Sequence, residues 1–193
     1  MNEKIKIIAG LGNPDKKYRH TRHNAGLDII EAVAQAYSIN IDKKKFNSLY
    51  SKDIIENNRV ILVKPMTYMN LSGFAIKKFS EYYNIDHINI IVIHDDIDLL
   101  LGRIKIKEKG GDGGHKGVRS IIEAFGDTNF IRVRFGVGRP KTEERIEISD
   151  YVLKSYDYFE KKNIKDSINK AKEAVISILL KGVKDSMNYF NRK

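Results

Sequence analysis

The residues best suited to chemistry lie in the stretch GLGNPDKKYRHTRHNAG, which follows a short apolar run near the start of the chain. Gly10 and Gly12 invite comparison with a dinucleotide-binding turn. Such a turn needs a helix directly after its glycines, so that the helix N–H groups meet the pyrophosphate. Here Pro14 interrupts the turn and the next helical pattern begins only near Asn24. The pattern therefore disfavours a nucleotide cradle and leaves two histidines to be explained.

Those two residues, His20 and His23, support two alternatives. Imidazoles three residues apart can share a metal ion, and the segment HDDID (His94 to Asp98) could supply the other half of the site. Arg22 between them disfavours a divalent cation. Alternatively, His23 is a general base and His20 a surface residue. A buried strand pattern, INIIVIH, would deliver Asp95 to the sheet end where it could orient the imidazole.

Neutral amides and a glycine-rich loop could add further groups to the same site. Asn13 and Asn70 each follow a strand pattern, so both could face the same end of the sheet. The loop GGDGGHKG (110–117) precedes a helix and leaves backbone N–H groups free for a phosphate or an ester carbonyl, with His115 and Lys116 at the helix start. The alternative is a simple flexible linker.

Composition and charge indicate a folded protein with a polyanionic partner. The chain has 193 residues, 41% of them hydrophobic, and 35 Lys and Arg against 25 acids. The cations alternate with apolar residues over 103–119, a pattern that suits nucleic acid phosphates or a solvated strand face. The absence of cysteine excludes disulfides and thiolate catalysis. No export signal or membrane-spanning run is apparent, so we expect a cytoplasmic location.

The periodicity of apolar residues predicts alternating strands and helices. We expect an α/β fold: a three-layer α/β/α sandwich around a mixed, mostly parallel twisted sheet, with a C-terminal helical lid. A single domain would span residues 1–193, with the lid at about 141–160 and a C-terminal helix at about 160–182. The predicted strands are 4–10, 48–56, 58–65, 87–96, 102–109 and 130–138, and the predicted helices before the lid are 24–37, 71–84 and 115–126. Asn24 is expected at a helix N-cap, and Asn57-Asn58 at a hairpin turn.

Four segments, in this order, resemble the bacterial peptidyl-tRNA hydrolase family. They are GLGNPDKKYRHTRHNAG, KPMTYMNLSG, VIHDDIDLLLGRIKIKEKGGDGGHKGVRSII and FIRVRFGVGRP. The resemblance implies a monomeric α/β/α enzyme without metal or organic cofactor, which hydrolyses the ester between a peptide and the 3′ ribose of tRNA. Its partner would be peptidyl-tRNA, bound through the acceptor stem, the 3′ end and the peptide, with no membrane involved.

The resemblance also implies roles for particular residues. His23 matches the catalytic base and Asp95 the carboxylate that orients it. Asn13 and Asn70 match amides that recognise the peptidyl group and position substrate or water. The remaining binding positions are Tyr18 and Tyr68 in the cleft, His115 and Lys116 in the glycine-rich gate, and Lys105, Lys107 and Arg134 for acceptor-stem phosphates. Lys116 departs from the asparagine usual in the family, and lysine cannot accept a hydrogen bond.

Two other functions stay open at this stage. Some members of the superfamily are organellar splicing factors that bind RNA without hydrolysing it, and a small-molecule esterase would need no basic surface. A non-catalytic protein has no need to keep a base, an acid and two amides together, and all four are present. With no cysteine and no Gly-x-Ser-x-Gly motif, we expect direct attack by water rather than a covalent route.

Overall fold

The computed structural model describes residues 5–140 and 146–192. Its strands are β1 (Lys6–Gly10), β2 (Lys43–Lys45), β3 (Ser48–Ile55), β4 (Asn58–Pro65), β5 (Ile90–Asp96), β6 (Ile104–Lys107) and β7 (Ile131–Gly136). Its α-helices are α1 (Ala25–Ala36), α2 (Ser72–Tyr83), α3 (Lys116–Phe125), α4 (Ile148–Val152), α5 (Tyr158–Lys181) and α6 (Val183–Phe190). Four short 3₁₀ helices are η1 (Lys16–Tyr18), η2 (Arg22–Asn24), η3 (Met69–Leu71) and η4 (His87–Asn89).

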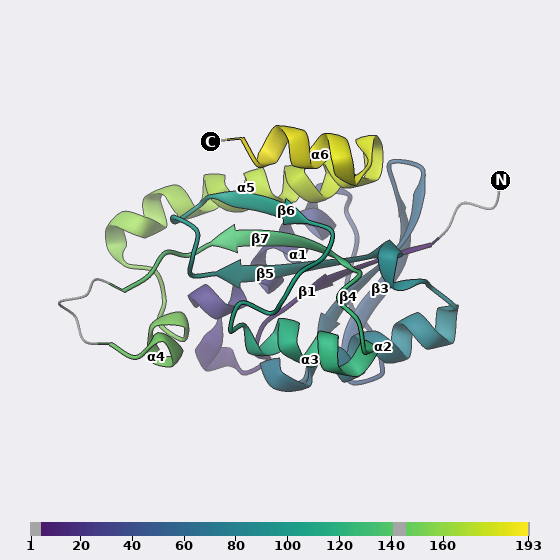
Figure 1. Cartoon of the computed structure of the whole chain (residues 1–193), viewed down its shortest axis with the longest axis horizontal. Helices are drawn as coiled ribbons and strands as arrows, with labels where there is room; N and C mark the ends of the chain where they lie inside the picture. Colours follow the sequence, from purple (N-terminus) through teal and green to yellow (C-terminus); the bar gives the residue numbers. More distant parts are fainter. Residues whose placement is uncertain (1–4, 141–145, 193) are drawn as a thin grey trace.

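The strands form one sheet in the order β2-β3-β4-β1-β5-β7-β6 (Figure 1). The central strands β4, β1, β5 and β7 pair in parallel. The pairs β2–β3, β3–β4 and β6–β7 are antiparallel. Because β2 reverses direction twice relative to β4, only β3 and β6 oppose the other strands. The predicted mixed, mostly parallel sheet is confirmed.

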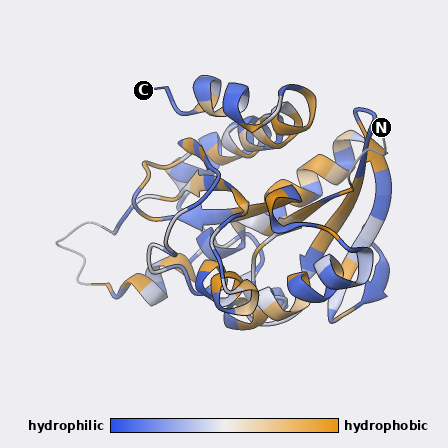
Figure 2. Cartoon of the chain, turned by 45° about the vertical axis from the view of Figure 1, so that its right-hand side comes forward, coloured by the Kyte–Doolittle hydropathy of each residue, from blue (hydrophilic) through white to orange (hydrophobic). Residues whose placement is uncertain are grey.

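Helices cover both faces of this sheet, with α1 and α5 on one side and α2 and α3 on the other (Figure 1). Successive residues of β1 supply the two cores in alternation: Ile8 packs with α1, whereas Ile7 and Ala9 pack with α2. Figure 2 shows the apolar residues concentrated on the inner strands and on one side of the helices. The predicted three-layer sandwich is therefore confirmed.

Two glycines hold the start of α1 directly against the sheet. A Cβ added to Gly26 would lie 2.4 Å from the carbonyl oxygen of Ile93, and one added to Gly10 would lie 2.3 Å from the carbonyl oxygen of Gly26. Only residues without a side chain permit this approach. The turn before α1 is thereby fixed over the C-terminal ends of β1 and β5. β5 ends there in Asp95 and Asp96.

The C-terminal helices have different positions relative to the sheet. α5 buries Ala171, Val175 and Ile178 in the core that it shares with α1, and α6 packs beside α5 and β6. The side chain of Asn191 donates to the carbonyl of Ile106 at 3.0 Å and accepts from its N–H at 2.8 Å, which covers part of the exposed edge of β6. Of the region expected as a lid, residues 141–145 lie outside the described residues.

One local prediction needs correction. The hairpin between β3 and β4 turns at Glu56 and Asn57, not at Asn57-Asn58, because Asn58 already pairs with Ile55. Both turn residues have positive φ, 49° and 59°, as a tight two-residue turn of this hand requires. The run Lys43–Lys45 forms the edge strand β2, which pairs with β3. Among the helices in the described ranges, none combines the length and the apolar character needed to cross a membrane.

Candidate active site

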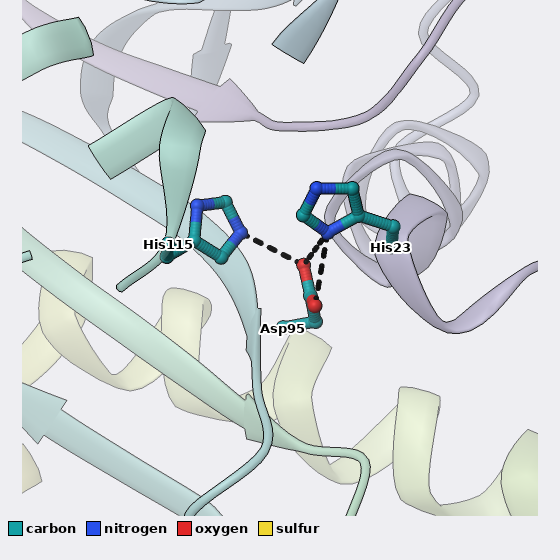
Figure 3. Close-up of side chains that lie close together, drawn as sticks. All are labelled: His23, Asp95 and His115. Carbon is teal, nitrogen blue, oxygen red and sulfur yellow. Dashed lines mark hydrogen bonds and ion pairs between the residues drawn. The ribbon is translucent and has the colours of Figure 1, made fainter. Parts of the chain in front are cut away.

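His23 and Asp95 meet at the C-terminal end of β5. His23 lies on η2, just before α1, and Asp95 on β5; both side chains are buried. His23 Nδ1 is 2.9 Å and 3.0 Å from the two carboxylate oxygens of Asp95 (Figure 3). An ionised carboxylate only accepts hydrogen bonds, so Nδ1 carries the proton. This arrangement leaves the lone pair of Nε2 free to accept a proton.

His115 bonds to the same carboxylate from the opposite side. Its Nε2 is 2.8 Å from Asp95 Oδ1, and its ring centroid is 4.9 Å from that of His23 (Figure 3). Its Nδ1 accepts from the N–H groups of Gly117 and Val118 at 3.1 Å and 3.2 Å, so His115 is the N-cap of α3. These contacts require the proton on Nε2, which donates to Asp95. The structure thus places His115 as a buried support of Asp95.

The two imidazoles determine the charge of Asp95. Burial alone would raise the pKa of this carboxyl group, but the charges and hydrogen bonds of His23 and His115 hold the pKa well below its usual range. Asp95 is therefore ionised throughout the physiological range. A fixed negative charge beside His23 favours the imidazolium that forms when His23 takes a proton.

The donor atoms of His23, Asp95 and His115 lie close enough together to suggest a metal site. A metal ion on His115 Nε2 would displace its proton to Nδ1, which already faces two backbone N–H groups. The cap and the metal are therefore incompatible. The alternative metal-binding pair, His20 and His23, is not brought together, because His20 is exposed and contacts Asp28 at 3.2 Å. These residues do not fit a metal ion.

Asn13 is held at the floor of the cleft by its neighbours. Its backbone N–H donates to Asn24 Oδ1 at 2.8 Å, and its carbonyl accepts from Asn24 Nδ2 at 3.0 Å. Asn13 Oδ1 accepts from the N–H of Met69 at 3.0 Å. Asn24 stands at the predicted N-cap position, but its side chain holds Asn13 and does not cap the helix. Because Asn13 lines the cleft with its oxygen engaged, Nδ2 is its available donor.

These residues line a cavity of about 830 Å³, and three further groups of residues form its walls. Tyr68 and Asn70, both exposed, stand on one side of it, and Lys116 lies on another at the start of α3. A third wall is formed by Ile148, Ser149, Val152 and Leu153, which belong to α4 or directly follow it. Tyr18 is on η1, half-buried, and is not among the residues that line the cavity. The site residues predicted from the sequence, except Tyr18 and the three basic strand residues, thus come together.

The basic strand residues form a neighbouring surface on β6 and β7. Lys105 is paired across the strands with Arg134, and Lys107 with Arg132. All four alternate with buried apolar residues and point away from the core that α5 shares. Arg134 Nε donates to Asp96 Oδ2 at 2.5 Å, so this cation is already paired. Arg132 is buried and donates to the carbonyls of Gly110 and Gly111, which fixes the glycine-rich loop.

The roles of two residues of the site were not identified from the sequence. His94 is buried, its Nδ1 donates to the carbonyl of Asp95 at 2.6 Å, and its ring lies 4.8 Å from that of His115. Burial, with the nearby His115 adding to it, lowers the pKa of His94 well below its ordinary value, so this imidazole stays neutral. The second is Arg22, whose neighbours are far away in sequence. No spacing pattern marks either role.

Arg22 joins the loop that carries His23 to the segment between α4 and α5. Its guanidinium donates to Glu160 at 2.6 Å and to the carbonyl of Ser155 at 2.9 Å. It also lies 4.2 Å from the ring centroid of Tyr151. Glu160 in turn completes a capping box with Asp157 at the start of α5. The wall formed by α4 is therefore anchored to the residue that precedes His23.

Comparisons with known proteins agree with this geometry. The family described as peptidyl-tRNA hydrolase matches residues 7–193. The peptidyl-tRNA hydrolases of Clostridium novyi (strain NT) and Clostridium acetobutylicum are 44% and 47% identical over 185 residues, covering 96% of this chain and 97% of each relative. A crystal structure of peptidyl-tRNA hydrolase from Acinetobacter baumannii superposes with a TM-score of 0.89 at 37% identity, covering 98% of this chain and 95% of that one.

Proposed function

Because this chain belongs to the peptidyl-tRNA hydrolase family and hydrolyses the ester that joins a peptide to the 3′-terminal ribose of tRNA, we propose that His23 is its general base. The observation that carries this proposal is the bond between His23 Nδ1 and Asp95, which leaves Nε2 as the only basic nitrogen of that ring. The family, the fold and the hydrolase activity that were predicted from the sequence are confirmed. The comparisons do not support the non-catalytic RNA-binding alternative.

The proposed reaction is a single attack by water. His23 Nε2 takes a proton from water while the oxygen adds to the ester carbonyl, and Asp95 stabilises the imidazolium. The tetrahedral intermediate then expels the 3′ oxygen of the ribose, which receives the proton back from His23. His115 keeps the carboxylate in place through its bond at 2.8 Å. Base catalysis of this kind contributes roughly 10²–10⁴ in rate.

Two asparagine amides, two tyrosine rings and one lysine complete the binding site in this proposal. The Nδ2 group of Asn13 donates to a carbonyl of the peptide. An unblocked aminoacyl group presents this position differently, so the contact distinguishes the two substrates. Asn70, exposed at the rim, positions the substrate or the attacking water. Tyr68 packs against the substrate at the same rim, and Lys116 meets a phosphate or a backbone carbonyl. Tyr18 would contact substrate only outside the cavity.

The basic surface beside the cleft is proposed to hold the acceptor stem. Lys105 and Lys107 project from the edge strand β6, and Arg134 lies next to them with its Nε on Asp96. Their spacing along an exposed edge suits phosphates of an RNA backbone. We further propose that residues 1–193 act as one domain and a monomer, without a cofactor, in the cytoplasm during translation.

The test is hydrolysis of N-acyl-aminoacyl-tRNA by two histidine variants. We expect His23→Ala to lose roughly 10²–10⁴ in turnover while it still binds tRNA. His20→Ala is the matched control, because the His20 side chain is exposed and its polar contact is with Asp28, away from Asp95. Unaltered turnover in the His23→Ala variant would refute the proposed base. Free aminoacyl-tRNA, tested with an Asn13→Ala variant, checks the recognition of the peptidyl group.

A further inference from the structure

An exposed stripe of large side chains runs from the cleft along helix α2. It consists of Tyr68, Leu71, Phe74, Lys78 and Tyr82, and we call it the α2 stripe. Tyr68 lines the cleft and is 55% exposed, whereas Leu71, Phe74 and Tyr82 lie outside the cleft lining at 52%, 56% and 60%. Scattered exposed apolar residues need no explanation, but a contiguous row that starts at a binding cleft does.

Phe74, Lys78 and Tyr82 lie on one face of α2, and Leu71 on η3 and Tyr68 just before it continue the row toward the cleft. Steps of three or four residues repeat from Tyr68 to Tyr82, and the opposite face, with Ile76 and Phe79, is buried in the core. Lys78 Nζ lies 4.7 Å from the ring centroid of Phe74. Lys45 Nζ, from β2, lies 3.5 Å from that of Tyr82. The stripe is therefore mainly apolar and aromatic. The amines of Lys78 and Lys45 lie over two of its rings.

The stripe lies on the opposite side of the cleft from the basic surface. α2 packs over β1 and β4, whereas Lys105 and Lys107 lie on β6, at the far edge of the sheet beyond β5 and β7. The scissile ester has RNA on one side and peptide on the other. If the acceptor stem occupies the β6 side, the peptide must leave on the side of Tyr68 and α2.

We propose that the α2 stripe binds the peptide of peptidyl-tRNA after it leaves the cleft, an inference that rests on the proposed function. Leu71 and Phe74 offer apolar contact to the side chains of any sequence. RNA fits this face less well, since the amines of Lys78 and of Lys45 from β2 lie over aromatic rings and Lys77 is 3.9 Å from Glu81. The 12 residues of α2 extend about 18 Å, the span of roughly six residues of extended peptide.

The binding of a long peptide should therefore depend on residues that a short one never reaches. The substrates are N-acetyl-aminoacyl-tRNA and the same tRNA bearing a peptide of about eight residues, long enough to cross the stripe. The test variant is Leu71→Ser with Phe74→Ser. Its matched control is Ile54→Ser on β3, because Ile54 is 64% exposed and lies on another element. Thermal unfolding of both variants checks the fold.

We expect the double variant to raise KM for the long substrate by roughly three- to tenfold, with kcat and the short substrate unaffected. Equal effects on both substrates, no effect on either, or the same effect in the control would overturn the proposal. Weaker binding of uncharged tRNA to the double variant would show an RNA surface instead. If the double variant does not fold, Phe74→Ser alone should raise KM for the long substrate by a smaller factor. A wild-type protein inactive on the short substrate would refute the proposed function itself.

Discussion

Replacing Asp95 with asparagine is expected to remove most of the catalytic rate while keeping tRNA binding. Asp95 Oδ1 receives hydrogen bonds from both His23 and His115, and Oδ2 lies 3.0 Å from His23 Nδ1. An amide oxygen at the Oδ1 position can still accept the bond from His115 Nε2. The amide NH₂ at the Oδ2 position then faces His23 Nδ1, which favours the tautomer in which Nδ1 accepts and Nε2 carries the proton. In that tautomer Nε2 cannot take a proton from water.

The size of the effect follows from the distance between the two groups. With about 4 Å between charge centres and an effective dielectric constant of about 20, the imidazolium–carboxylate attraction is about 4 kcal/mol. Losing this attraction in the transition state corresponds to roughly a thousandfold fall in kcat, since each 1.4 kcal/mol or so is a factor of ten. Substrate affinity should change little, because Asp95 is buried behind the histidines.

The same variant carries a second, independent expectation for stability. The pKa of Asp95 is held below its usual range in the folded protein. Below about pH 4, the unfolded chain therefore binds a proton that folded Asp95 does not, and the free energy of unfolding falls by about 1.4 kcal/mol per pH unit from this group. The Asp95→Asn variant lacks this contribution.

Two measurements test the reasoning about Asp95. Single-turnover hydrolysis of N-acyl-aminoacyl-tRNA gives the chemical rate, and binding of uncharged tRNA gives the control. Urea unfolding between pH 4 and pH 3 gives the difference in slope between the wild type and the variant. A rate within tenfold of the wild type would refute the role of the carboxylate. Identical slopes would refute the depressed pKa.

Two further predictions concern residues around the site. Arg22→Met should lower the free energy of unfolding by about 3–5 kcal/mol, because it leaves Glu160 and two backbone carbonyls without their buried donor, whereas Arg22→Lys should cost less. Chemical unfolding measures both, and equal stability of the Met variant and the wild type would contradict the anchor. Burial raises the pKa of Asp28 to about 6, so the folded state binds this proton more tightly than the unfolded state and loses stability as pH rises from about 4 to 6. Asp28→Asn should therefore be stabilised by about 1–2 kcal/mol relative to the wild type at pH 7.5, and this difference should shrink on acidification; a difference independent of pH would contradict it.

Periodicity predicted most of the fold, because most of its strands and helices have a strong local signal. β5 is a continuous apolar run ending in two acids, and α3 is bounded by His115 and Gly126. Elements with weak local signals were not predicted. β2 consists of three lysines and exists because β3 offers it a partner, and α6 has a short polar sequence that packs on α5. Such elements depend on tertiary contacts rather than on propensity.

The candidate site was predicted in its residue types but not in its contacts. Asn13, His23 and Asp95 were expected at one end of the sheet, and the structure brings them there. His115 was expected in a glycine-rich gate because of the family resemblance. Its capping bonds are local, but its bond to Asp95 depends on where the start of α3 lies relative to β5, which no local pattern encodes.

The role of Arg22 shows why local reasoning has this limit. From the sequence, Arg22 is only a positive charge between two histidines, and the argument from that charge disfavours a metal. In the fold, its partners Ser155 and Glu160 lie more than 130 residues away. A buried arginine needs such partners, since an unpaired buried cation is strongly unfavourable. The position of His23 therefore depends on a C-terminal segment that carries none of the proposed catalytic residues. Because α4 also forms a wall of the cleft, a change in the α4–α5 connection should affect substrate binding and the position of the base together.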